Sequence, residues 1–209
     1  GHGGSYAGHA DTAIALAEAG FVAAALTHPG DNWRDEHLAT AIWARPRQLK
    51  VMTDYLVDRW PEHGRIDAAR IGAFGFSAGG FTVLAEAGGE PDLSKVRKHC
   101  RDHPTFETCQ ITARQPQSWN VRPVWTHDVR IKAVVSAAPA IGFAFDKAGL
   151  SKVRQPVQLW RAADDQVLPH PWYAEAVRLA LPRPPQMHVV KGAGHYDFIP
   201  PCSAALAKA

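Results

Sequence analysis

Hydrophobic and polar residues recur with a helical period in several separate segments of the chain. Leu49, Met52, Leu56 and Trp60 are spaced by three or four residues, which predicts an amphipathic helix that Pro61 ends. By the same criterion, and from the residues that commonly begin and end helices, we expect helices at 9–19, 48–60, 77–87, 172–181 and 202–209.

Short and nearly continuous apolar runs alternate with these helical segments. They lie at 21–26, 70–76, 131–136, 156–161 and 186–190. Runs of this length are typical of strands that are buried on both faces of a sheet. Because strands and helices alternate, the sequence predicts a single α/β domain over residues 1–209, with a mostly parallel sheet and helices on both faces.

The segment 88–128 departs from this alternation. It contains two of the three cysteines, many charged residues and little periodicity. We therefore interpret it as an insertion or cap within the domain.

Composition and charge narrow the class of protein. The chain is 46% hydrophobic and 21% charged, which is typical of a globular protein. Lys and Arg are scattered among 20 acidic residues and the net charge is only +3, so we expect no nucleic-acid partner. The longest apolar stretches are interrupted by Glu18, Gly20, Pro139 and Gly142, which argues against a membrane span.

The strongest chemical signal is the motif Gly75-Phe76-Ser77-Ala78-Gly79, between a predicted strand and a predicted helix. Gly-x-Ser-x-Gly at such a junction is the pattern of a nucleophile elbow. The turn is so sharp that the flanking positions need residues with almost no side chain. It also presents the serine hydroxyl at a helix N-terminus, where main-chain N–H groups favour negative charge. Ser77 is therefore the candidate nucleophile.

A serine is a weak nucleophile unless a histidine takes its proton and a carboxylate orients that histidine. On this fold the order along the chain is serine, acid, histidine. The predicted strand 156–161 leads into Asp164 and Asp165, and the last predicted strand leads into His195. Asp197 is a third acid, for which we expect a local structural role because it lies only two residues beyond His195.

The segments 75–80, 162–169 and 192–198 resemble those of serine α/β-hydrolases. More narrowly, they resemble dienelactone-hydrolase-like esterases that are similar to platelet-activating-factor acetylhydrolase. The resemblance covers most of the chain and is weakest in the insertion. True dienelactone hydrolases carry a cysteine nucleophile, whereas Ser77 here implies ester hydrolysis.

The family pattern Gly-x-x-Asp-x-Val-x-Pro bears on the choice between the two neighbouring acids. It selects Asp165 if Ala162 takes the glycine position, because Val167 then follows in register. It selects Asp164 if Arg161 takes that position. We favour Asp165 and keep Asp164 as the alternative.

Residues 1–5 resemble the family's oxyanion loop, His-Gly-x-Gly-Gly, without its first histidine. The resemblance implies that the main-chain N–H groups of His2 and Ala78 hold the oxyanion. In another register of the loop, Gly4 replaces His2. Since the family fold usually begins with strands before this loop, the resemblance also implies that this chain lacks the usual N-terminal strands. The sequence starts at Gly1 without a signal peptide, so we expect either that a presequence was removed or that the chain is a fragment.

Cys100 and Cys109 enclose a short loop, for which we favour a disulfide over free thiols. A zinc site that includes His99 and His103 is a further alternative, although its spacing matches no common zinc motif. A disulfide would imply a secreted or periplasmic protein. We expect Cys202 to be a small buried hydrophobic residue.

These observations predict a serine esterase that needs no cofactor and cleaves small-molecule carboxylic esters with short to medium acyl chains. One alternative is a lipase, phospholipase or polyester hydrolase, and another is a weakly active or inactive hydrolase-fold binding protein. Four aromatic residues are candidates to line the acyl pocket: Trp119, Trp125, Phe143 and Phe145.

Overall fold

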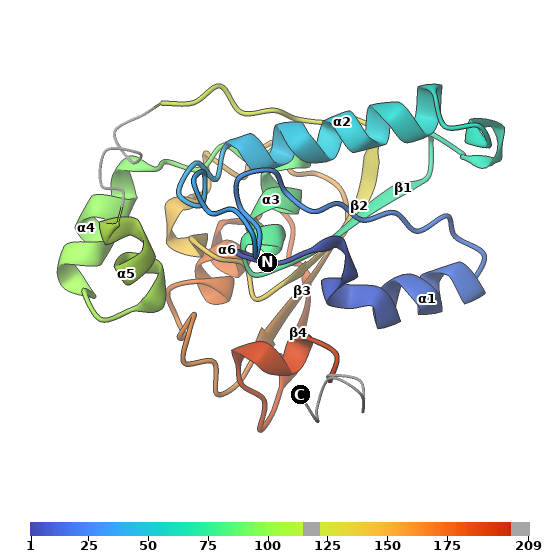
Figure 1. Cartoon of the computed structure of the whole chain (residues 1–209). Coiled ribbons are helices and arrows are strands. Elements are labelled where there is room, and N and C mark those ends of the chain that lie inside the picture. Colours follow the sequence, from blue (N-terminus) through green and yellow to red (C-terminus); the bar gives the residue numbers. More distant parts are fainter. Residues whose placement is uncertain (115–121, 202–209) are drawn as a thin grey trace.

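The computed structural model describes residues 1–114 and 122–201, which form an α/β-hydrolase fold (Figure 1). Its sheet has four strands in the order β1-β2-β3-β4, and each strand is parallel to its neighbours. The strands are β1 (Ile71–Phe76), β2 (Ile131–Ala137), β3 (Val157–Ala162) and β4 (Gln186–Val190). Four of the five predicted strands are thereby confirmed.

The helices that connect the strands agree with the periodicity of the sequence. The helices are η1 (Tyr6–His9), α1 (Ala10–Glu18), α2 (Ala44–Asp58), η2 (His63–Arg65), α3 (Ala78–Glu86), α4 (Ser94–Asp102), α5 (Glu107–Ala113), η4 (Gly142–Ala144), α6 (Ala174–Ala180) and η5 (His195–Phe198). Helix α2 begins four residues before the predicted 48–60, because Pro46 is compatible with the first turn of a helix. The helix predicted at 202–209, with Cys202, lies outside the described residues.

The fifth prediction, a buried strand at 21–26, is wrong. This segment is not part of the sheet, and Phe21 and Val22 are 59% and 45% exposed. An apolar run reflects the preference of its side chains, whereas a strand also needs a neighbouring chain for its main-chain hydrogen bonds. Within residues 1–114 and 122–201, no segment pairs with 21–26.

Helices lie on both faces of the sheet at β1. Alternate residues of a strand point to opposite faces. Gly75 faces α3, because a Cβ atom there would lie 2.1 Å from the carbonyl oxygen of Gly79. Phe74 and Phe76 face the other side, where their rings contact His9 between η1 and α1, at centroid distances of 5.1 and 5.5 Å.

The core is densest around α3, which packs on β1 and β2 and is covered by α2. Phe81 and Leu84 of α3 are fully buried, as is Leu159 of β3. Helix α6 packs on β3 further along the sheet. The start of α3, which follows Ser77, is therefore held within the core of the molecule.

The segment predicted as an insertion contains two helices, despite its weak periodicity. Helices α4 and α5 lie side by side (Figure 1) and are joined by a disulfide between Cys100 and Cys109. His99 of α4 stacks on Phe143, with ring centroids 3.6 Å apart, which attaches α4 to the segment after β2. Part of the segment and Trp119 lie in 115–121, outside the described residues.

No helix in the described ranges is both long and apolar enough to cross a bilayer.

Candidate active site

The nucleophile candidate sits on a strained turn between β1 and α3. Ser77 has φ 55° and ψ −118°, a region that serine rarely occupies. Its N–H donates to Ala137 O at 2.9 Å, and its carbonyl oxygen accepts from Phe81 N at 3.2 Å and Ala140 N at 3.0 Å. These three main-chain hydrogen bonds fix the turn from both sides, so the strained conformation is imposed by the surrounding fold.

The glycines around Ser77 differ in how strictly the turn requires them. Any side chain at Gly75 would collide with Gly79, as described above. A Cβ atom at Gly80, which the sequence did not single out, would lie 2.9 Å from Ala137 O. At Gly79 it would meet only Gly1 N, at 4.0 Å, which is ordinary contact. The steric demand therefore falls on Gly75 and Gly80 rather than on Gly79.

The structure brings Asp165 and His195 together as a buried pair. Asp165 Oδ2 lies 2.8 Å from His195 Nδ1, and the two residues are 8% and 4% exposed. The other oxygen, Oδ1, accepts from the main-chain N–H groups of Val167 at 3.0 Å and Leu168 at 2.7 Å. With both oxygens held, the carboxylate has a fixed orientation toward the imidazole.

The two other candidate acids lie apart from the imidazole pairing. Asp164 is exposed, and its main-chain N–H donates to Ala193 O at 3.0 Å. Asp197 Oδ2 accepts from Gly194 N at 2.8 Å and caps the start of η5. Of the three acids, Asp165 alone has a described hydrogen bond to His195.

Ser77 and His195 line the same cavity, whose volume is 210 Å³. The ring of Phe76 packs against the imidazole at a centroid distance of 4.7 Å. In the described part of the chain, no hydrogen bond joins Ser77 Oγ to His195. Such bonds commonly tighten only when a substrate is bound.

Most of the wall area of this cavity is apolar. Its walls include Ala39, Ile42, Phe76, Ile111, Ala140, Ile141, Val167, Leu168 and Ile199. A second cavity of 640 Å³ adjoins it and shares the lining residues His2, Glu107, Ile111 and Val167. This larger cavity also has Glu36, Gln110 and Arg114 in its walls, so it is more polar, and neither Ser77 nor His195 lines it.

Three of the four aromatic residues expected in the acyl pocket lie elsewhere, and the fourth, Trp119, is outside the described residues. Trp125, Phe143 and Phe145 are absent from the lining of both cavities. Trp125 and Phe145 pack on Phe81 in the core, and Phe143 stacks on His99. The expectation was wrong because large aromatic side chains are more often used to fill the core.

The loop at 1–4 lies beside the elbow. A Cβ atom at Gly1 would lie 3.5 Å from Ser77 Cβ. The N–H of Gly3 donates to Asp31 Oδ1 at 3.1 Å, and that of Gly4 to Gly1 O at 3.4 Å. Among the described hydrogen bonds, none uses the N–H of His2, so this donor is free to bind another group.

Ala78 supplies the other expected donor. It is the first residue of α3, where main-chain N–H groups have no acceptor within the helix. Among the described hydrogen bonds, none uses either of the two N–H groups predicted from the sequence. The N–H of the alternative donor Gly4, in contrast, donates to Gly1 O within its own loop.

The described residues contain no group of three or more His, Cys, Asp and Glu side chains that could hold a metal ion. The sulfur atoms of the alternative zinc set are bonded to each other in the Cys100–Cys109 disulfide.

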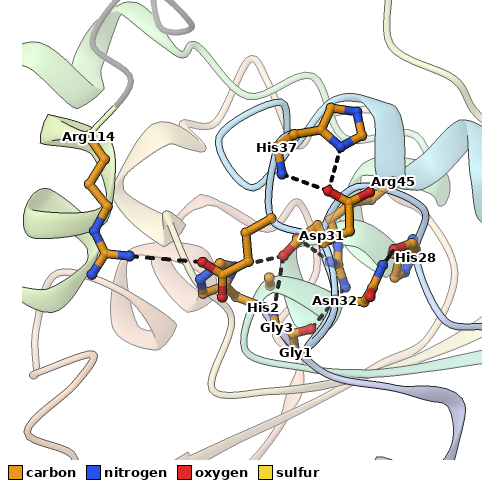
Figure 2. A network of polar contacts seen from close by, with 12 residues as sticks. Gly1, His2, Gly3, His28, Asp31, Asn32, His37, Arg45 and Arg114 are labelled. Atoms are coloured by element: carbon orange, nitrogen blue, oxygen red, sulfur yellow. Dashed lines mark hydrogen bonds and ion pairs between the residues drawn. The ribbon is translucent and has the colours of Figure 1, made fainter.

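A buried ion pair next to the loop was missed by the sequence analysis. Asp31 and Arg45 are each 3% exposed and pair directly with each other. Figure 2 shows Asp31 at the centre of a polar network that reaches Gly1, His2 and Gly3. A single sequence cannot reveal such a pair, because it does not show whether a charged residue is buried or exposed.

Comparisons with known proteins give a family match and a structural neighbour. Residues 8–97, less than half of the chain, match the Prolyl oligopeptidase family, and this range includes Ser77 but neither Asp165 nor His195. Among solved structures, the chain is similar to the acetyl ester-xyloside bifunctional hydrolase from Caldicellulosiruptor lactoaceticus, with 18% identity and a TM-score of 0.41. That alignment covers 74% of this chain but only 56% of the hydrolase. No curated protein matches.

The strand order and the elbow define the class of protein as an α/β-hydrolase. The family match over the elbow supports, within this class, a serine hydrolase.

Proposed function

We propose that the protein is a serine esterase that cleaves small carboxylic esters through an acyl-enzyme. Ser77 Oγ attacks the ester carbonyl carbon while His195 accepts its proton, and His195 then returns this proton to the leaving alcohol. Water, activated by His195, attacks the acyl carbon and releases the acid and free Ser77. Asp165 holds the imidazole in the required tautomer and stabilises its charged form. The observation that carries this proposal is the buried Asp165–His195 pair, whose imidazole lines one cavity with the strained Ser77.

The negative charge that develops on the carbonyl oxygen needs donors already in place. We assign this role to the N–H groups of His2 and Ala78. Two observations support the assignment. Among the described residues neither N–H has another acceptor, and Gly1 lies close to Ser77.

The size of the cavity favours short acyl groups. Its 210 Å³ is below the range of about 300–1,000 Å³ that is typical of sites for drug-sized ligands. Since its walls are mainly apolar, we place the acyl chain there and the alcohol toward the larger polar cavity. This arrangement argues against long-chain lipids as the preferred substrates.

The direct test is hydrolysis of a series of nitrophenyl esters from acetate to decanoate by the purified chain. We expect kcat/KM to be highest for the acetate to butyrate esters and to fall for longer chains. Ser77→Ala should abolish turnover and labelling by a fluorophosphonate, while its far-UV circular dichroism stays that of the wild type. Labelling of Ser77→Ala, or a maximum at decanoate, would contradict the proposal.

A second candidate is a peptidase, because the matched family is named for prolyl oligopeptidase. Peptide nitroanilides, assayed beside the esters, distinguish the two activities. An inactive binding protein would neither turn over any of these substrates nor react with fluorophosphonate.

We further propose that the protein works in an oxidising compartment, outside the cytoplasm. The Cys100–Cys109 disulfide supports this location, because such bonds rarely persist in a reducing cytosol.

A further inference from the structure

The buried pair of Asp31 and Arg45 contacts both segments that carry the proposed oxyanion donors. Arg45 is in the first turn of α2, and Asp31 is in the loop that follows 21–26. Charged groups are rarely kept in a core unless they are paired, and removal of one partner is strongly destabilising. The contacts of this pair therefore indicate its role beyond the mutual neutralisation of the two charges.

On one side, the pair holds the loop that contains His2. Asp31 Oδ1 lies 2.6 Å from His2 Nδ1 and accepts from Gly3 N at 3.1 Å (Figure 2). A guanidinium nitrogen of Arg45, Nη2, donates to Gly1 O at 3.5 Å. The groups on both sides of the His2 N–H are thus fixed by these two residues.

On the other side, Arg45 reaches the helix that begins at Ala78. Its Nε donates to Thr82 Oγ1 at 3.1 Å, and the Thr82 hydroxyl donates to Ala78 O at 2.6 Å. Thr82 is 1% exposed, so this chain of hydrogen bonds is protected from water. One planar guanidinium consequently links the loop at 1–3 with the first turn of α3.

The charge of Asp31 is well suited to this role. Burial alone would raise the pKa of Asp31, but the hydrogen bond from His2, the charge of Arg45 and the Gly3 N–H hold it at about 2. The carboxylate therefore remains ionised, and its hydrogen bonds remain intact, throughout the pH range in which an esterase would be assayed.

We infer that Arg45, through Asp31 and Thr82, is a positioning residue that sets the distance between the N–H groups of His2 and Ala78. The inference rests on the proposed esterase function. In this role Arg45, on α2, touches no reacting atom but determines the spacing of the two donors. A lysine could keep the charge at position 45, but its single ammonium lacks the planar fork that reaches both sides.

The test uses two variants of graded severity. Thr82→Val removes one hydroxyl at nearly constant volume, and Arg45→Lys keeps the charge but loses the fork. Because oxyanion donors act in the transition state, we expect kcat to fall about 10-fold in Thr82→Val and about 100-fold in Arg45→Lys, with KM within about twofold. Affinity for a trifluoromethyl ketone, which forms a tetrahedral adduct, should fall by similar factors.

Two control variants separate positioning from stability. Thr53→Val on α2 removes a buried hydroxyl that likewise bonds to the carbonyl four residues earlier, Leu49 O, at 3.2 Å. Arg130→Lys alters an arginine that pairs with Asp54 and Asp128, toward the other end of α2. Both controls should lower the melting temperature yet keep wild-type kcat.

The possible outcomes distinguish the two proposals. Wild-type kcat in Thr82→Val and Arg45→Lys, or a rise in KM alone, would overturn the positioning role while the esterase function stands. If Arg45→Lys fails to fold, Thr82→Val decides. A wild-type chain without ester hydrolysis would contradict the proposed function, and the positioning role with it.

Discussion

Asp164 and Asp165 are adjacent carboxylates with opposite environments, so they offer a matched pair of substitutions. Asp165→Asn should lower kcat/KM by roughly 10³–10⁴-fold, because an amide at this place no longer selects the tautomer needed for proton transfer. Asp164→Asn should stay within about twofold of the wild type, since Asp164 is exposed. Steady-state kinetics on a short-chain ester measure both. Equal losses in the two variants would refute the assignment of Asp165.

A second residue with a distinct environment is Glu86, at the end of α3. It is fully buried, and neither carboxylate oxygen has a hydrogen-bond partner among the described residues. Burial, with a smaller contribution from the charge of Asp128, raises the pKa of Glu86 to about 8. The folded chain thus holds a proton on Glu86 at pH values where the unfolded chain has released it.

Because the pKa of Glu86 is higher in the folded state than its ordinary 4.5, its contribution to stability is complete below pH 4.5 and is lost as the pH rises toward 8. Glu86→Gln cannot ionise and should not show this loss. We expect the variant to gain stability relative to the wild type between pH 5 and pH 8, by an amount on the order of 1.4 kcal/mol per pKa unit as an upper limit. Urea unfolding at both pH values checks this; a constant difference would show that Glu86 is ionised at pH 5.

Among single residues, those whose order along the chain is determined by the chemistry could be predicted from the sequence. Ser77, Asp165 and His195 were selected because each follows a predicted strand in a fixed order. Arg45 and Asp31 could not be selected in this way. Their pairing depends on a loop and a helix that meet only in the folded chain, and neither residue has a characteristic spacing from Ser77.

Among the elements, the turn between β1 and α3 makes the most specific demand on sequence. Gly75→Ala should destabilise the protein by about 3 kcal/mol or more, because its Cβ would lie 2.1 Å from the main chain at Gly79. Gly79→Ala should leave stability unchanged or raise it by about 0.5 kcal/mol, since the new methyl group has room and an alanine restricts the unfolded chain. Thermal unfolding compares the two variants. Equal melting temperatures would mean that the turn relaxes to admit a side chain at Gly75.

Whether an element could be predicted depends on whether a local sequence pattern or a contact with a distant residue determines it. Buried parallel strands have apolar residues on both faces, so β1 to β4 were visible as short runs. The segment 21–26 has the same composition, and only the lack of a described pairing partner distinguishes it. Helices α4 and α5 were not recognised because their segment has little periodicity, and because α4 is attached through the His99–Phe143 stack, between residues distant in sequence.

Across the whole molecule, the α/β class could be predicted because strands and helices alternate from one end of the chain to the other. The position of the cavity could not be predicted, since residues from β1, α3, α5 and several loops contribute to its walls. The expected aromatic pocket was wrong because the sequence does not show which way a side chain faces, and Trp125 and Phe145 pack on Phe81 in the core.

The order of the strands has a consequence for how the protein would refold. Ser77 follows β1, Asp165 follows β3 and His195 follows β4, while β1 and β4 are the outer strands of the described sheet. While only part of the sheet is assembled, at least one of these three residues is not yet in its place in the site. Recovery of ester turnover after dilution from denaturant would therefore mark the last docking event, whereas the helical circular dichroism signal would return earlier. Comparing the two time courses would separate early collapse from final assembly.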